Sequence, residues 1–78
     1  MPRSLRTPDH LRLQKLLADL RKACLLSQTQ LAQRLGRPQS FVAKYEGGER
    51  RLDVIEFIEV AQALESDPSE LLARIYRP

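Results

Sequence analysis

The sequence predicts an all-α protein, a compact bundle of five helices. Apolar residues recur at the 3.6-residue spacing of helices, and no segment has the two-residue period of a strand. Residues that start or stop helices separate these segments and leave only short connections. The chain has 78 residues, of which 42% are hydrophobic and 29% charged, a globular balance for one small domain.

The N-terminal part predicts a loose arm and one long helix. Residues 1–8 contain two prolines and no apolar period, so we expect a flexible arm before a single domain over residues 9–78. Asp9 is placed to cap a helix that ends near Cys24. The buried stripe of this helix is expected to contain Leu13, Leu16, Leu17, Leu20 and Cys24.

Two short helices are predicted next, on either side of a glycine. Ser27 as N-cap and Gln30 three residues later form a capping box, and Gly36 is a helix stop. Pro38 suits the first turn of the following helix, which is expected to end near Glu46. The inner faces of the two helices are expected to contain Leu31, Ala32, Leu35, Phe41, Val42 and Tyr45.

Two more helices complete the predicted bundle. Asp53 with Glu56 is a second capping-box-like start, and Asp67, Pro68 and Glu70 form a third start. Their buried stripes are expected to contain Val54, Phe57, Ile58, Ala61, Leu64, Leu71, Leu72 and Ile75. Since these helices are short, packing between them must hold the fold together.

Charge and composition exclude several classes of protein. Residues 1–51 hold eleven Lys or Arg and four Asp or Glu (+7), whereas residues 52–78 hold two and six (−4). This imbalance indicates either a surface that faces a polyanion or ordinary solvated charge. The chain has no apolar run that could span a membrane, and one cysteine without an export signal favours the cytoplasm.

No pattern of catalytic residues is present in the sequence. We find no Ser/His/Asp set, no metal-ligand cluster and no phosphate-cradling glycine loop. We therefore expect no enzyme activity, no cofactor, no metal and no small-molecule substrate. The lone histidine, His10, is expected to be solvated or to cap a helix.

The outward face of the third predicted helix is suited to base pairs. At 100° per residue, the apolar anchors cluster on one side, and the opposite side holds Gln39, Ser40, Ala43 and Lys44. Gln can pair with adenine, Lys can donate to guanine, Ser is permissive, and Ala can touch a thymine methyl. The alternative is an ordinary solvated helix face.

The pair of short helices favours the base-pair interpretation. Two helices joined by a short turn around a glycine form a helix-turn-helix, whose second helix enters the major groove while the first crosses the backbone. The amides that begin residues 28–35 would then face a phosphate. Arg50 and Arg51, beyond Gly47–Gly48, are placed for further phosphates.

The segment "LRKACLLSQTQLAQRLGRPQSFVAKYEGGERR", followed by "FIEVAQAL" and "DPSELL", resembles the phage-repressor-like (Xre-type) helix-turn-helix proteins. The resemblance runs from about Leu13 to Leu72. It implies a lambda-repressor-like five-helix domain that binds double-stranded DNA as a homodimer on a near-palindromic operator. The corresponding function is transcription regulation, expected to be repression.

The resemblance also implies roles for single residues in DNA binding. Gln28 would grip a phosphate and brace the recognition helix, with Gln39 as its partner and as a base reader. Ser40 and Lys44 fall at base-contact positions. Phe41 falls where a residue near the DNA backbone is common, and it would touch a thymine methyl or sugar unless it belongs to the core.

Further implied roles concern the phosphates and the scaffold. Gly48 would offer its amide to a phosphate, and Arg50 stands at a commonly basic position. Arg21 and Glu46 match a structural ion pair that ties the first helix to the end of the third.

The chain departs from the family pattern at four positions. Leu25 and Glu65 replace common glycines at helix ends, where a left-handed non-glycine residue costs on the order of 1 kcal/mol. Pro38 replaces a small polar cap, and Arg37 replaces an apolar residue. We therefore expect local differences at these helix ends and in the reach of Gln39.

The surface outside the predicted stripes carries leftover apolar residues. We predict that a two-fold dimer forms through the C-terminal helices, using Ile55, Val60, Ile75 and Tyr76. The alternative function is an antitoxin or adaptor, in which the same fold binds a protein partner.

Overall fold

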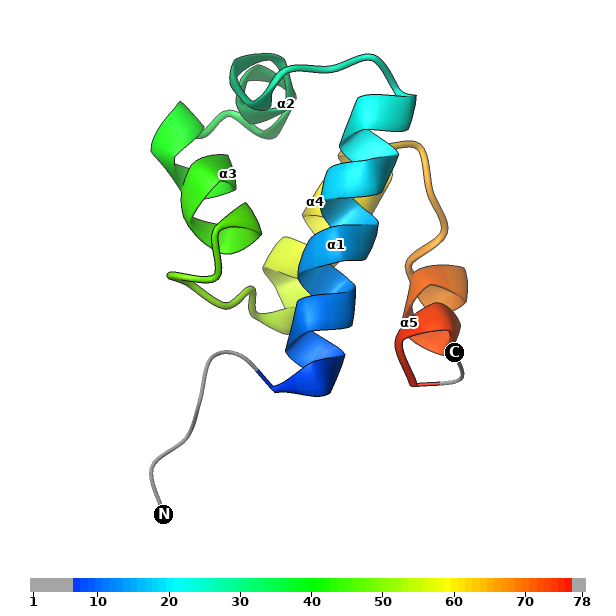
Figure 1. The fold of residues 1–78 in the computed structure, drawn as a ribbon. Coiled ribbons are helices and arrows are strands. Elements are labelled where there is room, and N and C mark those ends of the chain that lie inside the picture. The colour runs from blue at the N-terminus through cyan, green and yellow to red at the C-terminus, as the bar shows by residue number, and fades with distance from the viewer. Residues whose placement is uncertain (1–6, 77–78) are drawn as a thin grey trace.

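The computed structural model describes residues 7–76, and within this range it contains five α-helices and no strand. The predicted all-α bundle of five helices is thus confirmed (Figure 1). Residues 1–6 of the predicted arm lie outside the described residues. The helices are α1 (Pro8–Ala23), α2 (Gln28–Leu35), α3 (Gln39–Glu46), α4 (Val54–Ala63) and α5 (Pro68–Tyr76).

Helix α1 runs through the middle of the molecule and contacts α3 on one side and α5 on the other (Figure 1). Helix α4 lies behind α1 in this view and contacts both α2 and α5. Helices α2 and α3 pack against each other as the predicted pair. Because α3 is at the edge of the bundle, one of its sides is left without a neighbouring helix.

The core draws side chains from every helix. Its buried apolar members are Leu17, Leu31, Ala32, Phe41, Val42, Tyr45, Phe57, Val60, Ala61, Leu64 and Leu71. The predicted stripe of α4 is wrong in two places, because Val60 is fully buried while Val54 is exposed. Leu72 of α5 is also largely exposed. Helix α4 turns the positions of Phe57, Val60 and Leu64 inward, so Val60 is not free for a partner.

The helix starts are close to those predicted. Ser27 and Asp53 both complete capping boxes. At α1 the predicted cap is wrong: Thr7 is the N-cap, with its Oγ1 accepting the amide of His10 at 3.2 Å, while Asp9 lies in the first turn. His10 was expected to be solvated or to cap a helix, but its side chain is buried and Thr7 is the cap. Pro38 occupies the N-cap of α3, one residue before its predicted place, and makes no side-chain cap.

Two helices end with non-glycine residues in the left-handed conformation. Leu25 has φ of 59° and Glu65 has φ of 55°, at the two helix ends where the resemblance implies glycine. After α1 the amide of Leu26 bonds the carbonyl of Arg21 at 3.1 Å, and after α4 Ser66 bonds Ala61 at 2.9 Å. The chain therefore keeps the glycine-type helix ending and accepts the backbone strain.

Residues 7–76 include no helix that is both long and apolar enough to cross a membrane. In the same range, no three His, Cys, Asp or Glu side chains are grouped so that they could hold a metal ion.

Candidate nucleic-acid interface

The turn between α2 and α3 sets the angle of the exposed helix. Gly36 adopts φ of 67°, which allows the chain to reverse at the end of α2, and the amide of Arg37 bonds the carbonyl of Ala32 at 3.0 Å. On α3, Val42 and Tyr45 are buried in the core. The opposite side presents Gln39, Ser40 and Lys44 as exposed side chains and Ala43 as a half-buried one.

Two glutamines join the start of α3 to the start of α2. The Nε2 of Gln39 donates to Oε1 of Gln28 at 2.7 Å, and the Nε2 of Gln28 donates to Oε1 of Glu46 at 3.1 Å. Gln28 thus links both ends of α3. The predicted partnership of Gln28 and Gln39 is present without DNA, and it fixes the Gln39 amide group at the N-terminal end of the exposed face.

Arg21 and Glu46 form the predicted ion pair with two hydrogen bonds. Arg21 Nε lies 2.8 Å from Glu46 Oε2, and its Nη2 lies 3.0 Å from Oε1. The Nη1 of Arg21 also donates to the carbonyl of Leu26 at 2.8 Å. Hydrogen bonding to Glu46 raises the pKa of Arg21. Both side chains are largely shielded from water, so the pair is a structural tie between α1 and α3.

Phe41 and Arg50 are not free DNA-contacting side chains in this structure. Phe41 is only 7% exposed, which favours the core alternative over a contact with DNA. The guanidinium carbons of Arg37 and Arg50 lie 4.4 and 4.9 Å from the centre of its ring. Arg50 also forms a two-fold hydrogen-bonded ion pair with Glu56, at 2.8 and 2.6 Å. Arg50 is thus ion-paired in this structure, and its expected contact with a phosphate stays a prediction.

Gly48 allows the side chain of Gln14 to approach the loop after α3 closely. With φ of 82° it is left-handed, and an added Cβ would lie 2.8 Å from Nε2 of Gln14. That same Nε2 donates to the carbonyl of Glu46 at 3.0 Å. The amide of Gly48 has a long contact of 3.4 Å with the Tyr45 carbonyl. Arg51 is exposed on the same loop.

Gln14 and Glu56 also belong to this site, although no local sequence pattern predicts it, and Arg37 stands out in the sequence only as a departure from the family pattern. Glu56 was visible as a capping-box residue, but its second role with Arg50 was not. The one sequence feature related to Gln14 is Gly48, because a glycine there leaves room for a side chain from a distant helix. Such contacts join residues far apart in the sequence, so local patterns do not show them.

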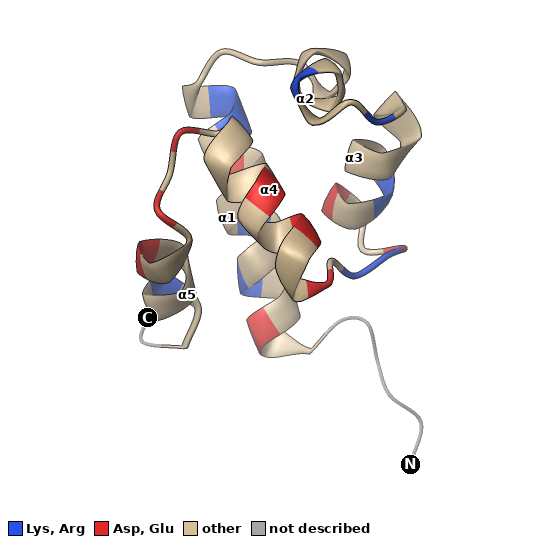
Figure 2. Ribbon diagram, turned by 180° about the vertical axis from the view of Figure 1, so that it is seen from behind, with Lys and Arg blue, Asp and Glu red and all other residues tan. Residues whose placement is uncertain are grey.

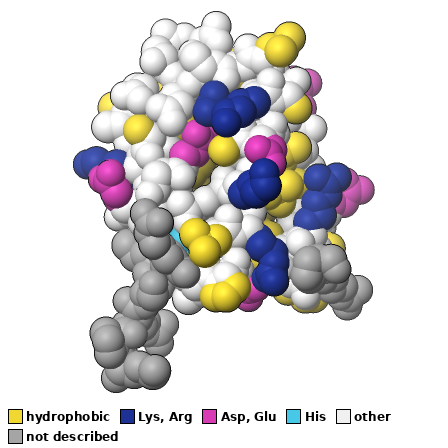
Figure 3. Space-filling model, in the orientation of Figure 1, with side chains coloured by type: hydrophobic (Ala, Val, Ile, Leu, Met, Phe, Trp, Pro, Cys, Tyr) yellow, Lys and Arg dark blue, Asp and Glu magenta, His cyan; other side chains and the backbone are white. Residues whose placement is uncertain are grey.

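Ion pairs within the protein neutralise much of its basic charge. Six described cations pair with carboxylates, namely Arg12, Lys15, Arg21, Arg34, Arg37 and Arg50. Figure 3 shows Lys and Arg mixed with Asp and Glu on the face over α1. Figure 2 shows acidic positions along α4 and basic positions in the connections before and after α3. Lys44 forms no ion pair with any residue of the described range, so its charge remains available on α3.

Comparisons with known proteins agree with this geometry. A family profile described as helix-turn-helix matches residues 17–71. An "XRE-family like protein" from Pseudomonas syringae pv. tomato str. DC3000 is 46% identical, with a TM-score of 0.84 over 90% of this chain and 88% of that chain. The restriction-modification controller protein C.AhdI from Aeromonas hydrophila is 34% identical, with a TM-score of 0.76 over 83% and 98%. No curated protein gave a match.

Proposed function

Because the chain belongs to the Xre-type helix-turn-helix family of DNA-binding transcription regulators, we propose that it is a sequence-specific repressor that acts as a homodimer in the cytoplasm. The observation that carries this proposal is the exposed polar side of α3. Its apolar side is buried in the core, and both of its ends are held through Gln28 and Glu46. A face held this firmly suits the reading of base edges.

The proposed base readers are the side chains on the open side of α3. Gln39 can pair with adenine, and Lys44 can donate to guanine O6 and N7. Ser40 and Ala43 would contact neighbouring bases, with the Ala43 methyl suited to thymine. The hydrogen bond that Gln39 donates to Gln28 leaves part of the Gln39 amide group free while limiting its rotation.

The proposed phosphate contacts lie at the two ends of the α2–α3 unit. The start of α2, with Gln28, offers amides and the positive end of a helix dipole. Gly48 and Arg51 would contact the backbone beyond α3. Each phosphate contact should make the slope of log K against log salt more negative by about 0.9.

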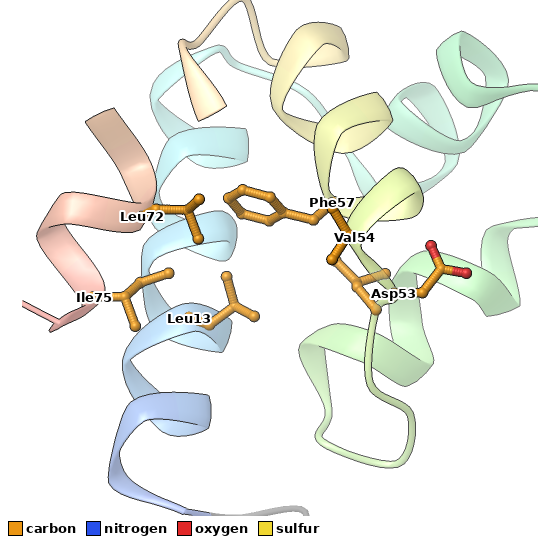
Figure 4. A pocket seen from close by; sticks show the side chains of 7 residues that line it. Leu13, Asp53, Val54, Phe57, Leu72 and Ile75 are labelled. Atoms are coloured by element: carbon orange, nitrogen blue, oxygen red, sulfur yellow. The ribbon is translucent and has the colours of Figure 1, made fainter. Parts of the chain in front are cut away.

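The proposed dimer would use an apolar groove between α1, α4 and α5. Figure 4 shows Leu13, Phe57, Leu72 and Ile75 pointing toward one another across it, with Val54 at its edge. The groove encloses about 190 Å³, and Leu72 and Val54 are exposed there. Two-fold pairing through this groove would place two recognition helices on half-sites about 34–36 Å apart.

DNA selection from a random duplex pool tests the function. We expect the bound sequences to share a two-fold-symmetric motif. Gln39→Ala and Lys44→Ala should each relax one position of the motif and weaken operator binding by about 1–3 kcal/mol. The matched controls are Gln62→Ala on α4 and Lys22→Ala on α1, which should leave the motif unchanged. An unchanged preference in both α3 variants would refute the assignment of the recognition face.

A protein partner that co-purifies with the chain, together with no enriched DNA motif, would instead support the antitoxin or adaptor function.

A further inference from the structure

Two arginines beside the recognition helix are held by a carboxylate of α4. Arg50 bonds Glu56 through Nη1 to Oε1 at 2.8 Å and through Nη2 to Oε2 at 2.6 Å. Arg37 Nη1 lies 3.4 Å from the same Oε2. Arg37 Nη2 also lies 3.7 Å from Oε1 of Glu59. One buried carboxylate thus faces two guanidinium groups that come from the connections on either side of α3.

The surroundings of Glu56 keep this arrangement ionised and fixed. Glu56 is 8% exposed, and its Oε1 also accepts the amide of Asp53 at 2.9 Å. Hydrogen bonds from Arg50 and then from the Asp53 backbone lower the pKa of Glu56 to about 2. If both arginines left this carboxylate, a buried charge would be unpaired, which is strongly unfavourable. The ion pairs should therefore persist when the protein meets DNA.

The two guanidinium groups lie where free charges would act on DNA phosphates. Their central carbons are 4.4 and 4.9 Å from the centre of the Phe41 ring, which is part of α3. A helix is about 10–12 Å across and the major groove about 12 Å wide, so the flanks of a docked helix come close to both phosphate strands. Charges on these flanks would act on phosphates within the Debye length, which is about 8 Å at physiological salt. The Arg37 and Arg50 side chains are 36% and 37% exposed.

Resting on the proposed function, we propose that Glu56 is a specificity-determining residue that withholds Arg37 and Arg50 from the DNA backbone. Phosphate contacts strengthen binding to every sequence alike, whereas base contacts discriminate. Two unpaired arginines on the flank of α3 would raise affinity for all DNA. Their pairing with Glu56 leaves the discrimination to the open face of α3.

The test is the salt dependence of binding to a non-operator duplex, compared for the natural protein and Glu56→Gln. We expect Glu56→Gln to bind this duplex more tightly, with a log–log salt slope steeper by about 0.9 for each released arginine. The ratio of operator to non-operator affinity should fall. Glu70→Gln on α5 is the matched control, because it removes the same charge without touching Arg37 or Arg50. It should leave the slope unchanged.

A second comparison separates released arginines from a general gain of positive charge. In the Arg37→Gln/Arg50→Gln background, adding Glu56→Gln should no longer steepen the slope. A full effect in that background would overturn the proposal, as would an unchanged or shallower slope for folded Glu56→Gln alone. Circular dichroism establishes that each variant is folded.

If Glu56→Gln does not fold, Glu56→Asp provides the same test, because the shorter side chain withdraws the carboxylate from both guanidinium groups. The slope should again steepen for binding to the non-operator duplex, and Arg37→Gln/Arg50→Gln should abolish the change. An unchanged slope in folded Glu56→Asp would then refute the proposal. A natural protein without operator preference would refute the proposed function itself, whereas operator preference with an unchanged slope refutes only the role of Glu56.

Discussion

Glu46 joins three helices through one side chain and one carbonyl. Its carboxylate accepts hydrogen bonds from Arg21 and Gln28, and its backbone carbonyl accepts one from Gln14. These partners come from α1 and α2, so the C-terminal end of α3 is fixed to both. The carboxylate loses most of its hydration at this place, and Arg21 offsets that loss. The intact pair adds little net stability, but either partner alone would be an unpaired, shielded charge.

Arg21→Ala should therefore lower the free energy of unfolding by about 3–5 kcal/mol. Urea denaturation measures this change. Lys15→Ala is the matched control, since Lys15 pairs with Asp19 on the open surface of α1, and the expected loss there is below about 1 kcal/mol. Similar losses in the two variants would contradict a structural role for the Arg21–Glu46 pair.

His10 makes stability depend on pH. Its Nε2 is buried without a hydrogen-bond partner among the described residues. Burial, and then the positive charge of Arg51, lower the pKa of His10 below 6.5. The unfolded chain therefore takes up a proton at His10 more readily than the folded chain does. The free energy of unfolding keeps its full value above pH about 6.5 and decreases as the pH falls from there toward the pKa of His10 in the folded protein. Thermal unfolding at pH 7.5 and 5.5 should show this loss, and His10→Gln should reduce it.

At the scale of elements, the ends of α1 and α4 keep a shape that suits glycine better than the residues present. Leu25 is 89% exposed and left-handed, so its side chain contributes few contacts while its backbone is strained. Local pattern predicted these ends well, because capping boxes, stop residues and apolar periods act within one or two turns. The apolar pattern wrongly placed Val60 outside the buried stripe of α4. The rotation of this helix about its axis is set by the helices packed against it and not by its own sequence.

Leu25→Gly should raise the free energy of unfolding by about 1 kcal/mol, which corresponds to roughly 4–8 °C in Tm for a domain of this size. The change relieves the left-handed strain and removes little packing. Gln33→Gly, in the exposed interior of α2, is the control and should lower stability because glycine weakens a regular helix. A loss of stability in Leu25→Gly would show that the Leu25 side chain is needed where it lies.

At the scale of the molecule, only part of the basic charge in the sequence is left unpaired on the surface of the folded protein. The basic excess of residues 1–51 is compatible with either a polyanion-facing surface or ordinary solvated charge, and Arg37 and Arg50 meet carboxylates of the acidic segment. Helical periodicity identified the open face of α3, because an eight-residue helix has few ways to bury its aromatic residues. The pairing of distant charges could not be predicted, since it depends on how α4 packs behind α3.

The apolar groove beside α5 leads to the last prediction. Leu72→Glu would place a charge among Leu13, Phe57 and Ile75, which a partner copy would otherwise cover. We expect the variant to sediment as a monomer at tens of micromolar, a concentration at which we expect the natural protein to be a dimer. Leu25→Glu is the matched control, because it makes the same change at an exposed site far from the groove, and Glu65 shows that a left-handed helix end accepts glutamate.

The dimer prediction also has a consequence for DNA. A monomer loses the linkage between its two recognition helices, so Leu72→Glu should weaken binding to a two-fold operator far more than binding to a single half-site. Equal weakening on both duplexes would point to damage within the fold, which circular dichroism would reveal. A natural protein that stays monomeric both alone and on the operator would refute the dimer, while leaving the recognition face of α3 to be judged by the selected DNA motif.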